Sequence, residues 1–165
     1  MTIQTRRERD RAERERLIVT AARELAESEG WDAVTTRRLA AQIEYSQPVL
    51  YSHFKGKDAI MAAVAVQGCA DLAEELRTAR TAAKGTREAL AAVGETYTAF
   101  GRRRPALYDA MFTYRVDLPF ATAEAPEPLK RAFGEIAAAV ERLPERDHEQ
   151  RLALLIGHFT AGASR

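Results

Sequence analysis

The side chains best suited to chemistry with a partner molecule lie in one short run, Gln47–His53. The amide of Gln47 can form paired hydrogen bonds with adenine, and Pro48 or Val49 can pack on the methyl group of thymine. Each residue is weak support when taken alone, since a tyrosine such as Tyr51 is more often simply packed on its own helix. Their joint spacing indicates a surface that contacts the edges of DNA bases.

Two residues that flank this run are placed to meet phosphate groups. Thr35 caps the preceding helix, and Lys57 opens the following one. A hydroxyl group, an ammonium group and the free backbone N–H groups at a helix start can all donate hydrogen bonds to phosphate oxygens. A lone lysine is usually only solvated, so the position of Lys57 beside the run is what indicates a phosphate contact.

Three predicted helices position these residues. A helix from about 14 to 29 ends at Gly30, a residue that readily adopts the left-handed conformation of a helix stop. Two short helices follow over 35–43 and 47–53, with a break at 44–46 between them. A long helix followed by two short ones around a tight turn is the arrangement of a helix-turn-helix, whose second helix lies in the DNA major groove. The apolar residues expected in its core are Leu39, Ile43, Leu50 and Phe54.

The rest of the chain also has helical periodicity, without a convincing strand. Further helices are predicted over about 57–80, 86–100, 105–112, 129–143 and 152–159, with a proline-bearing loop over Asp117–Pro128. The sequence therefore predicts an all-α protein of eight helices. We expect a charged arm over 1–16, a helix-turn-helix DNA-binding domain over 17–56, and a further helical domain over 57–165. The family resemblance described below implies that this last domain binds an effector and dimerises.

Composition excludes several classes of protein. The 25 Lys and Arg residues nearly balance the 24 Asp and Glu residues, so any binding to nucleic acid must come from local placement of charge. The longest run without these four residue types covers 13 residues, whereas a membrane span needs about 20 apolar residues. The N-terminus lacks the apolar stretch of a secretory signal, so we expect a cytoplasmic protein.

Catalytic and metal-binding groups do not emerge from the sequence. A single cysteine, Cys69, excludes an internal disulfide and a cysteine-based zinc site, and we expect it to be buried rather than reactive. The three histidines lack the spacing of metal ligands. Phosphate-binding loops and nucleophile motifs do not occur either. We therefore expect no enzymatic activity, no metal and no cofactor.

Residues 17–65 resemble the DNA-binding domain of the tetracycline-repressor (TetR) family of bacterial regulators. The resemblance is carried by Gly30-Trp31, by TTRRLA at 35–40, by SQPVLYSHF at 46–54 and by KGKD at 55–58. It implies a transcriptional repressor that binds a palindromic operator in double-stranded DNA as a homodimer and is released by a small effector. It further implies base-edge or groove contacts from Arg37, Gln47, Pro48, Val49 and Tyr51, and phosphate contacts from Thr36, His53 and Lys57, in addition to Thr35.

Two features depart from the family pattern. The family usually has glycine in the turn where this chain has Glu44, and a left-handed conformation costs such a residue about 1 kcal/mol. We expect Glu44 to point away from the phosphates, or the turn to differ slightly. Family members are also normally longer and dimerise through their last two long helices, whereas this chain ends at Arg165. We expect either that the final helix is absent or that the chain is a truncated form.

The C-terminal half is rich in aromatic rings. They lie on stripes at 90/93/97/100, 107/108/111/112 and 129/133/136/140, which should converge on one interior because helices joined by short breaks usually pack side by side. Such rings suit an ordinary core, and they also suit the wall of an apolar cavity. We predict a pocket for a small, largely apolar effector, closed by the loop over 117–128 and lined by Tyr97, Phe100, Tyr108, Met111, Phe112, Phe133 and Phe159.

The residues alone leave other functions possible, and they allow several interpretations of the N-terminal segment. A helical small-molecule carrier or sensor without DNA binding would explain the rings but not the run over 35–57. An enzyme of the helical-bundle type would need metal ligands or an acid–base pair that the sequence does not offer. Residues 1–16, with six arginines and four acidic residues, fit a solvated helical extension, a disordered tail, or an arm that reaches toward the minor groove.

Overall fold

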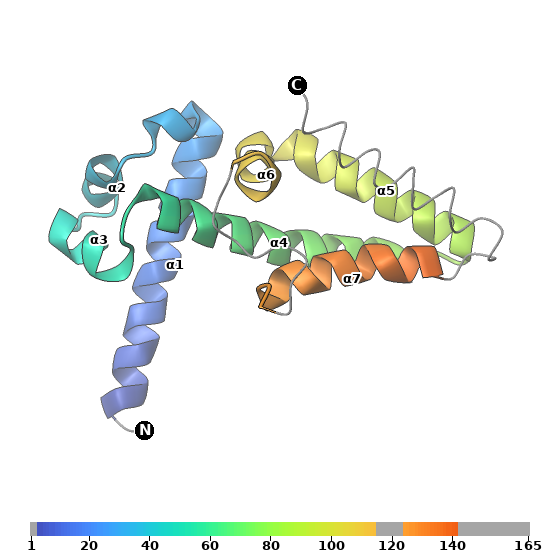
Figure 1. Cartoon of the computed structure of the whole chain (residues 1–165), viewed down its shortest axis with the longest axis horizontal. Coiled ribbons are helices and arrows are strands. Elements are labelled where there is room, and N and C mark those ends of the chain that lie inside the picture. Colours follow the sequence, from blue (N-terminus) through green and yellow to red (C-terminus); the bar gives the residue numbers. More distant parts are fainter. Residues whose placement is uncertain (1–2, 115–123, 142–165) are drawn as a thin grey trace. The chain divides into compact units, whose positions relative to one another are not determined.

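A computed structural model describes residues 3–114 and 124–141 of the chain (Figure 1). Within these ranges the chain forms seven α-helices and one short 3-10 helix, and no strand. The prediction of an all-α fold is confirmed. Contacts divide the chain into two compact units, of which the first comprises residues 1–65 and 104–117 and the second residues 66–103 and 118–165.

The first unit contains the predicted helix-turn-helix. Its elements are α1 (Ile3–Glu29), the 3-10 helix η1 (Trp31–Ala33), α2 (Thr36–Gln42), α3 (Gln47–His53), the start of α4 (Lys57–Ala82) and α6 (Pro105–Phe112). The predicted bounds of the two short helices are confirmed to within a residue. Gly30 has φ of 84°, which confirms the predicted left-handed stop after α1.

Helix α1 begins at Ile3, well before the predicted start near residue 14. The added segment has few apolar side chains, so apolar periodicity could not reveal it. Charge spacing supports it instead, since Arg11 Nε lies 2.9 Å from Oε1 of Glu15 one turn later. Pairs of this kind stabilise a helix by about 0.2–0.5 kcal/mol. From residue 3 onward, the charged N-terminal segment is therefore a helical extension of α1.

The core of the first unit joins four helices. Ile18 and Ala22 on α1, Leu39 on α2, Leu50 on α3 and Ile60 on α4 have no exposed surface. Full burial of a leucine or isoleucine side chain contributes about 1.5–3 kcal/mol. This core therefore fixes the orientation of α2 and α3, and with it the direction in which their polar residues point.

The second unit contains the rest of α4, together with α5 (Thr86–Arg103) and α7 (Glu127–Glu141). Its buried side chains include Leu76 on α4, Phe100 on α5 and Val140 on α7. An ion pair of 2.7 Å between Arg80 Nε and Glu135 Oε2 joins α4 to α7. The three helices therefore share one core.

Two predicted segments fall largely or wholly outside the described residues. They are the loop over 117–128, of which residues 124–126 are described as non-helical, and the helix over 152–159. Helix α7 starts at Glu127, two residues before the predicted apolar stripe. Among the described helices, none is both long enough and apolar enough to cross a membrane.

Candidate nucleic-acid interface

Helix α2 starts at a threonine cap. Thr35 has an extended backbone, with φ of −128° and ψ of 151°, and its Oγ1 accepts a hydrogen bond of 3.2 Å from the backbone N–H of Arg38. A cap of this kind contributes about 0.5–2 kcal/mol. It orients the first turn of α2, where Thr36 and Arg37 are both predicted DNA contacts.

The turn between α2 and α3 contains the residue that departs from the family pattern. Glu44 has φ of 58°, in the left-handed region that favours glycine. The backbone N–H of Tyr45 donates to the carbonyl oxygen of Ala40 at 2.9 Å, and that of Glu44 donates to Ala41 at 3.4 Å, which is the paired pattern of a Schellman stop. The chain thus keeps the left-handed turn at a cost of about 1–2 kcal/mol, and the expected alternative of a different turn is not adopted.

Helix α3 presents one face to solvent and buries the other. Gln47, Pro48 and Val49 are exposed, and Tyr51 is 51% exposed. Leu50, between them, is completely buried. An amide, two apolar side chains and a phenol on a two-turn helix have the size and the chemistry to read base edges in a major groove. The four predicted base contacts on α3 therefore share one solvent-exposed surface.

Two neighbouring arginines on α2 have different surroundings. Arg38 contacts both carboxylate oxygens of Glu29 at the end of α1, at 2.9 and 2.7 Å. These hydrogen bonds lower the pKa of the Glu29 carboxyl and raise the pKa of the Arg38 guanidinium. Arg37 is exposed, and Thr36 beside it has its Oγ1 3.3 Å from the hydroxyl oxygen of Tyr51. Arg38 thus joins α2 to the end of α1, while Arg37 is exposed next to Thr36, which contacts Tyr51 of α3.

His53, a predicted phosphate contact, faces α1 instead of solvent. Its Nδ1 lies 3.3 Å from Oε1 of Glu15, and its side chain is 5% exposed. Glu15 also pairs with Arg11, whose guanidinium donates to the carbonyl oxygen of Ser52 at 3.5 Å. These contacts hold the end of α3 against α1. A phosphate contact by His53 stays a prediction from the resemblance, and its ring has little surface left for one.

Lys57, also a predicted phosphate contact, is half-buried at the start of α4. Its Nζ donates a hydrogen bond of 2.5 Å to the carbonyl oxygen of Trp31. An ammonium group carries three N–H donors, so this bond leaves others for a phosphate oxygen. Lys57 therefore joins α4 to η1.

Sequence reasoning missed the residues that attach α6 to the group of helices α1, η1, α2 and α3, which we call the head. The Glu27 carboxylate accepts hydrogen bonds from the backbone N–H groups of Leu107 at 2.9 Å and Ala106 at 3.3 Å. The indole N–H of Trp31 donates to the carbonyl oxygen of Ala106 at 2.7 Å. The first N–H groups of a helix need partners from outside it, and Arg104 gives α6 no side-chain cap. No local signal could identify Glu27, since Leu107 lies 80 residues further along the chain.

The residues predicted to line one effector pocket are divided between the two units. Tyr108, Met111 and Phe112 lie on α6 in the first unit. Tyr97 and Phe100 on α5 and Phe133 on α7 lie in the second unit. Phe159 lies outside the described residues. Within α6, the rings of Tyr108 and Phe112 pack with centroids 4.8 Å apart. Neither unit alone contains the single interior expected for the three stripes, and the pocket stays a prediction.

Helix α7 buries a different stripe from the one predicted. Its buried residues are Ala132, Ile136, Ala139 and Val140, whereas Phe133 is 70% exposed. The prediction that Phe133 belongs to the interior stripe is wrong. Positions 132, 136, 139 and 140 already complete a helical stripe, and Phe133 lies about 100° around the helix from Ala132.

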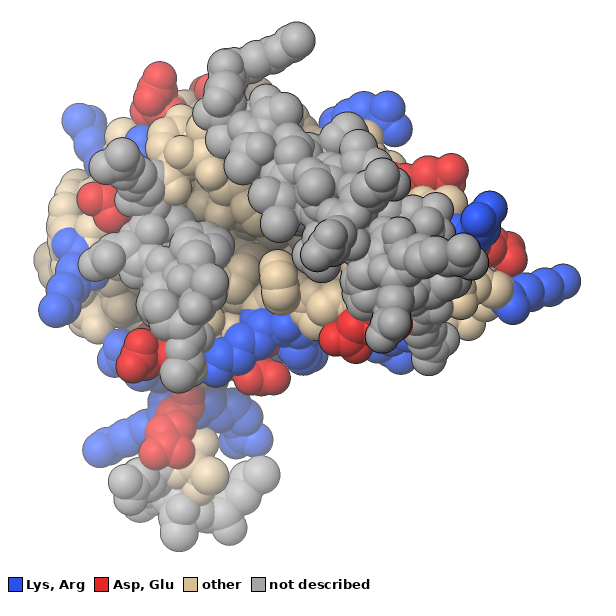
Figure 2. Space-filling model, turned by 45° about the vertical axis from the view of Figure 1, so that its right-hand side comes forward, with Lys and Arg blue, Asp and Glu red and all other residues tan. Residues whose placement is uncertain are grey.

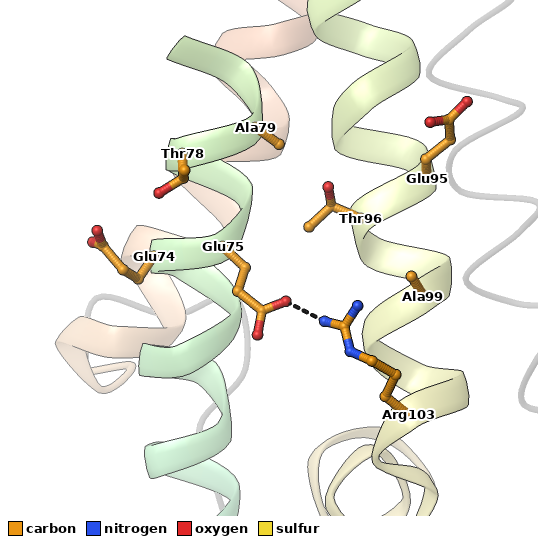
Figure 3. Close-up of a pocket in the computed structure, with 8 residues that line it drawn as sticks. All are labelled: Glu74, Glu75, Thr78, Ala79, Glu95, Thr96, Ala99 and Arg103. Carbon is orange, nitrogen blue, oxygen red and sulfur yellow. Dashed lines mark hydrogen bonds and ion pairs between the residues drawn. The ribbon is translucent and has the colours of Figure 1, made fainter. Parts of the chain in front are cut away.

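A hollow of about 490 Å³ lies in the second unit, between α4 and α5 (Figure 3). Glu75 on α4 and Arg103 on α5 point toward one another there, with Arg103 Nη2 2.5 Å from Glu75 Oε2. The lining consists of Glu74, Glu75, Thr78, Ala79, Glu95, Thr96, Ala99 and Arg103. It includes none of the predicted pocket residues, and its charged walls do not match the largely apolar effector that the rings suggest.

The described part of the chain holds a buried cysteine and no cluster of metal-binding side chains. Cys69 is buried in the second unit, and burial raises the pKa of its thiol to about 11. The thiol is therefore protonated at neutral pH, as expected for a buried cysteine. Within residues 3–114 and 124–141, no group of three or more His, Cys, Asp or Glu side chains could hold a metal ion.

Two family models match separate parts of the chain. Residues 18–64 match the model of bacterial regulatory proteins of the tetR family. Residues 90–161 match the model of the tetracyclin repressor-like C-terminal domain. The first match contains the whole helix-turn-helix, and the two matches together cover more than half of the chain.

Individual proteins agree with these matches. The chain is 32% identical over 96 residues to the uncharacterized HTH-type transcriptional regulator YobS of Bacillus subtilis (strain 168), covering 58% of this chain and 50% of that protein. It is 28% identical over 151 residues to the tetracycline repressor protein class D of Escherichia coli, covering 88% of this chain and 62% of that protein. The matched part thus spans about half to three-fifths of the length of these relatives.

A solved structure supports the fold. The structure of a protein with unknown function from Rhodococcus sp. RHA1 matches with a TM-score of 0.66 and 21% sequence identity. The match covers 90% of this chain and 82% of that one. At this identity the likeness concerns the arrangement of helices alone.

Proposed function

Because the chain belongs to the tetR family of bacterial regulatory proteins, we propose that it regulates transcription by binding double-stranded DNA through α2 and α3. Members of this family are DNA-binding regulators and not enzymes. The observation that carries the proposal is the exposed face of α3. Gln47, Val49 and Tyr51 stand in solvent, while Leu50 anchors the same helix in the core.

In this proposal α3 lies in the major groove. Gln47 forms paired hydrogen bonds with an adenine, and Pro48 and Val49 pack on thymine methyl groups. Tyr51 and Arg37 contact the groove beside them. These contacts carry the sequence preference, because base edges in the groove differ between sequences whereas phosphate groups do not.

Phosphate contacts in this proposal come from the ends of the helices. Thr35 and Thr36 lie at the start of α2, and Lys57 lies at the start of α4. A helix start presents backbone N–H groups and a positive dipole end to an anion. These residues would fix the register of α3 on the duplex without reading its sequence. The resemblance adds His53, although its side chain is only 5% exposed and faces Glu15.

We further propose that a small, largely apolar effector releases the protein from its operator and so relieves repression. Helix α6 is the element that supports this, because it carries Tyr108, Met111 and Phe112 and is bonded to the head through Glu27 and Trp31. An effector that binds one arrangement of α6 more tightly shifts the head toward that arrangement. The size of the shift equals the difference in binding free energy between the two arrangements.

Function as a homodimer also belongs to the proposal. A palindromic operator offers two equivalent half-sites, and a symmetric dimer presents one copy of α3 to each. In functional terms, residues 17–56 act as the DNA-binding domain, and residues 57–165 bind the effector and the second copy. Residues 1–16 form the charged arm that precedes them.

Electrophoretic mobility shift with DNA flanking the gene tests the DNA-binding part. We expect the full chain to retard a duplex that contains a palindrome at concentrations at which a shuffled duplex of equal length stays free. A double variant, Gln47→Ala with Tyr51→Ala, changes two exposed residues and should fold normally but lose this preference. A chain that binds all duplexes equally weakly would instead fit a carrier or sensor that does not use DNA.

A further inference from the structure

The N-terminal part of helix α1 extends beyond Arg11, where α1 contacts the end of α3. The contact between Arg11 and Ser52 joins α1 to the end of α3, and residues 5–9, which precede it, are exposed. In Figure 1 this N-terminal part of α1 runs on past α3 as a regular helix. At 1.5 Å per residue, residues 3–11 span about 12 Å. We name residues 3–11 of α1 the arginine arm.

The arginine arm carries unpaired positive charge. Arg6, Arg7 and Arg9 are exposed, and among the described residues none of the three makes an ion pair. The acidic residues of the arm are Glu8 and Asp10, so the arginines outnumber them. Figure 2 shows Lys and Arg side chains spreading outward from the lower, protruding part of the molecule, with Asp and Glu side chains between them. A local excess of this kind on a nearly neutral chain points to a specific anionic partner.

The arm is joined to α3 by side-chain contacts at its C-terminal end. Glu15 lies 3.3 Å from His53 and 2.9 Å from Arg11, and Arg11 in turn reaches the carbonyl oxygen of Ser52. All of these residues belong to the first unit. Arg7 lies one turn before Arg11 on the same side of the helix, since residues four apart are neighbours on a helix surface. The contacts of α1 with His53 and Ser52 therefore fix the direction of the arm relative to α3, the helix that we propose enters the major groove.

We propose that Arg6, Arg7 and Arg9 bind phosphates of the DNA backbone that flank the base pairs read by α3. The proposal rests on DNA binding through α3. A helix is about 10–12 Å across with its side chains, whereas the minor groove is about 6 Å wide. The arm therefore lies along the backbone and does not enter the minor groove as an extended arm would. It extends the contacted stretch of DNA and strengthens binding to every sequence alike.

Salt dependence of binding distinguishes this role from base reading. Each phosphate contact contributes about 0.9 to the slope of log K against log salt concentration. The slope is negative, and the triple variant Arg6→Ala, Arg7→Ala, Arg9→Ala should make it shallower by roughly 2.7 per bound chain. Alanine has the highest helix propensity, so the arm should stay helical, which circular dichroism checks.

The experiment uses the full chain and two duplexes between about 50 and 200 mM salt. One duplex is enriched from a random library by the unaltered chain, and the other is its shuffled counterpart. A matched control, Lys84→Ala, Arg87→Ala, Arg102→Ala, removes three exposed charges from the second unit. The variant with lysine at positions 6, 7 and 9 keeps the charge and should keep most of the slope.

The outcomes separate the arm from the DNA-binding proposal itself. A shallower salt slope on both duplexes in the arm variant alone, with the preference between duplexes kept, supports phosphate binding by the arginine arm. An unchanged salt slope, or an equal change of slope in the control variant, overturns phosphate binding by the arginine arm, while DNA binding through α3 stands. Failure of the unaltered chain to bind either duplex overturns DNA binding through α3, and the arm with it.

Discussion

The helix-turn-helix and the second unit differ in the range of the contacts that shape them. In the former, the cap at Thr35, the turn at Glu44 and the anchor at Leu50 all lie within sixteen residues of one another. In the second unit, the ion pair between Arg80 and Glu135 joins residues 55 positions apart. The former is shaped largely by near neighbours, and the latter by helices that meet from distant parts of the chain.

This difference explains why the buried face was predicted correctly for α3 and wrongly for α7. On α3, alternation between exposed and buried residues follows from helical geometry once Leu50 points inward. On α7, the apolar stripe could be drawn through Phe133 or through Ala132, and only packing against α5 and α4 selected the latter. Five changes test how far the contrast extends.

Leu50→Ala should have the largest effect. Leu50 is completely buried, and a leucine-to-alanine change in a core costs about 2–5 kcal/mol of the free energy of unfolding. The matched control is Val49→Ala, one residue away and 38% exposed, which should cost far less. Urea denaturation followed by circular dichroism measures both. Equal losses at the two positions would contradict the division of α3 into a buried and an exposed face.

Gln47→Ala should act on binding and leave stability unchanged. Loss of a bidentate contact to adenine costs about 1–3 kcal/mol on the true operator and relaxes discrimination at one base position of each half-site. Titration of operator duplexes with single base changes measures this. Equal losses on operator and shuffled DNA would mean that Gln47 positions α3 without reading a base.

Glu27→Ala tests the long-range contact that brings α6 into the first unit. Loss of a side chain that caps a helix start costs about 0.5–2 kcal/mol, and Glu27 accepts from two N–H groups of α6. Glu24→Ala, an exposed change one turn earlier on α1, is the control. Thermal and urea unfolding should rank Glu27→Ala as the less stable variant. Indistinguishable stability would mean that water satisfies the start of α6 equally well.

Lys57→Ala separates a phosphate contact from a structural bond. If the ammonium meets a phosphate as well as the Trp31 carbonyl, its loss should lower the salt slope by about 0.9 on all sequences. Lys84→Ala in the second unit removes the same charge and should leave the slope unchanged. Reduced stability together with an unaltered slope would assign Lys57 to the protein scaffold alone.

Phe133→Ala should have the smallest effect. The side chain is 70% exposed, and surface changes usually shift the free energy of unfolding by less than about 0.5 kcal/mol. The comparison is Ile136→Ala on the same helix, at a buried position, where a loss of about 2–5 kcal/mol is expected. A large loss at Phe133 in urea denaturation would restore the stripe predicted from the sequence.

Much of the candidate interface could be predicted from the sequence. The bounds of α3, the cap at Thr35 and the stop at Gly30 were all expected and found. A helical extension was only one of three interpretations of residues 1–16, because charge pairs rather than apolar residues stabilise the segment from Ile3 onward. The surroundings of His53 could not be predicted either, since Glu15 lies 38 residues away on another helix.

The sequence by itself determined the all-α class, most helix bounds and which residues form the exposed face of α3. These depend on spacings of three and four residues, which fix the neighbours on a helix surface. The tertiary structure decided that α6 packs with the head through Glu27 and Trp31, and that Phe133 is exposed. The reason is that the entropic cost of closing a loop grows slowly with its length. Separation along the chain therefore says little about which distant helix a side chain will meet.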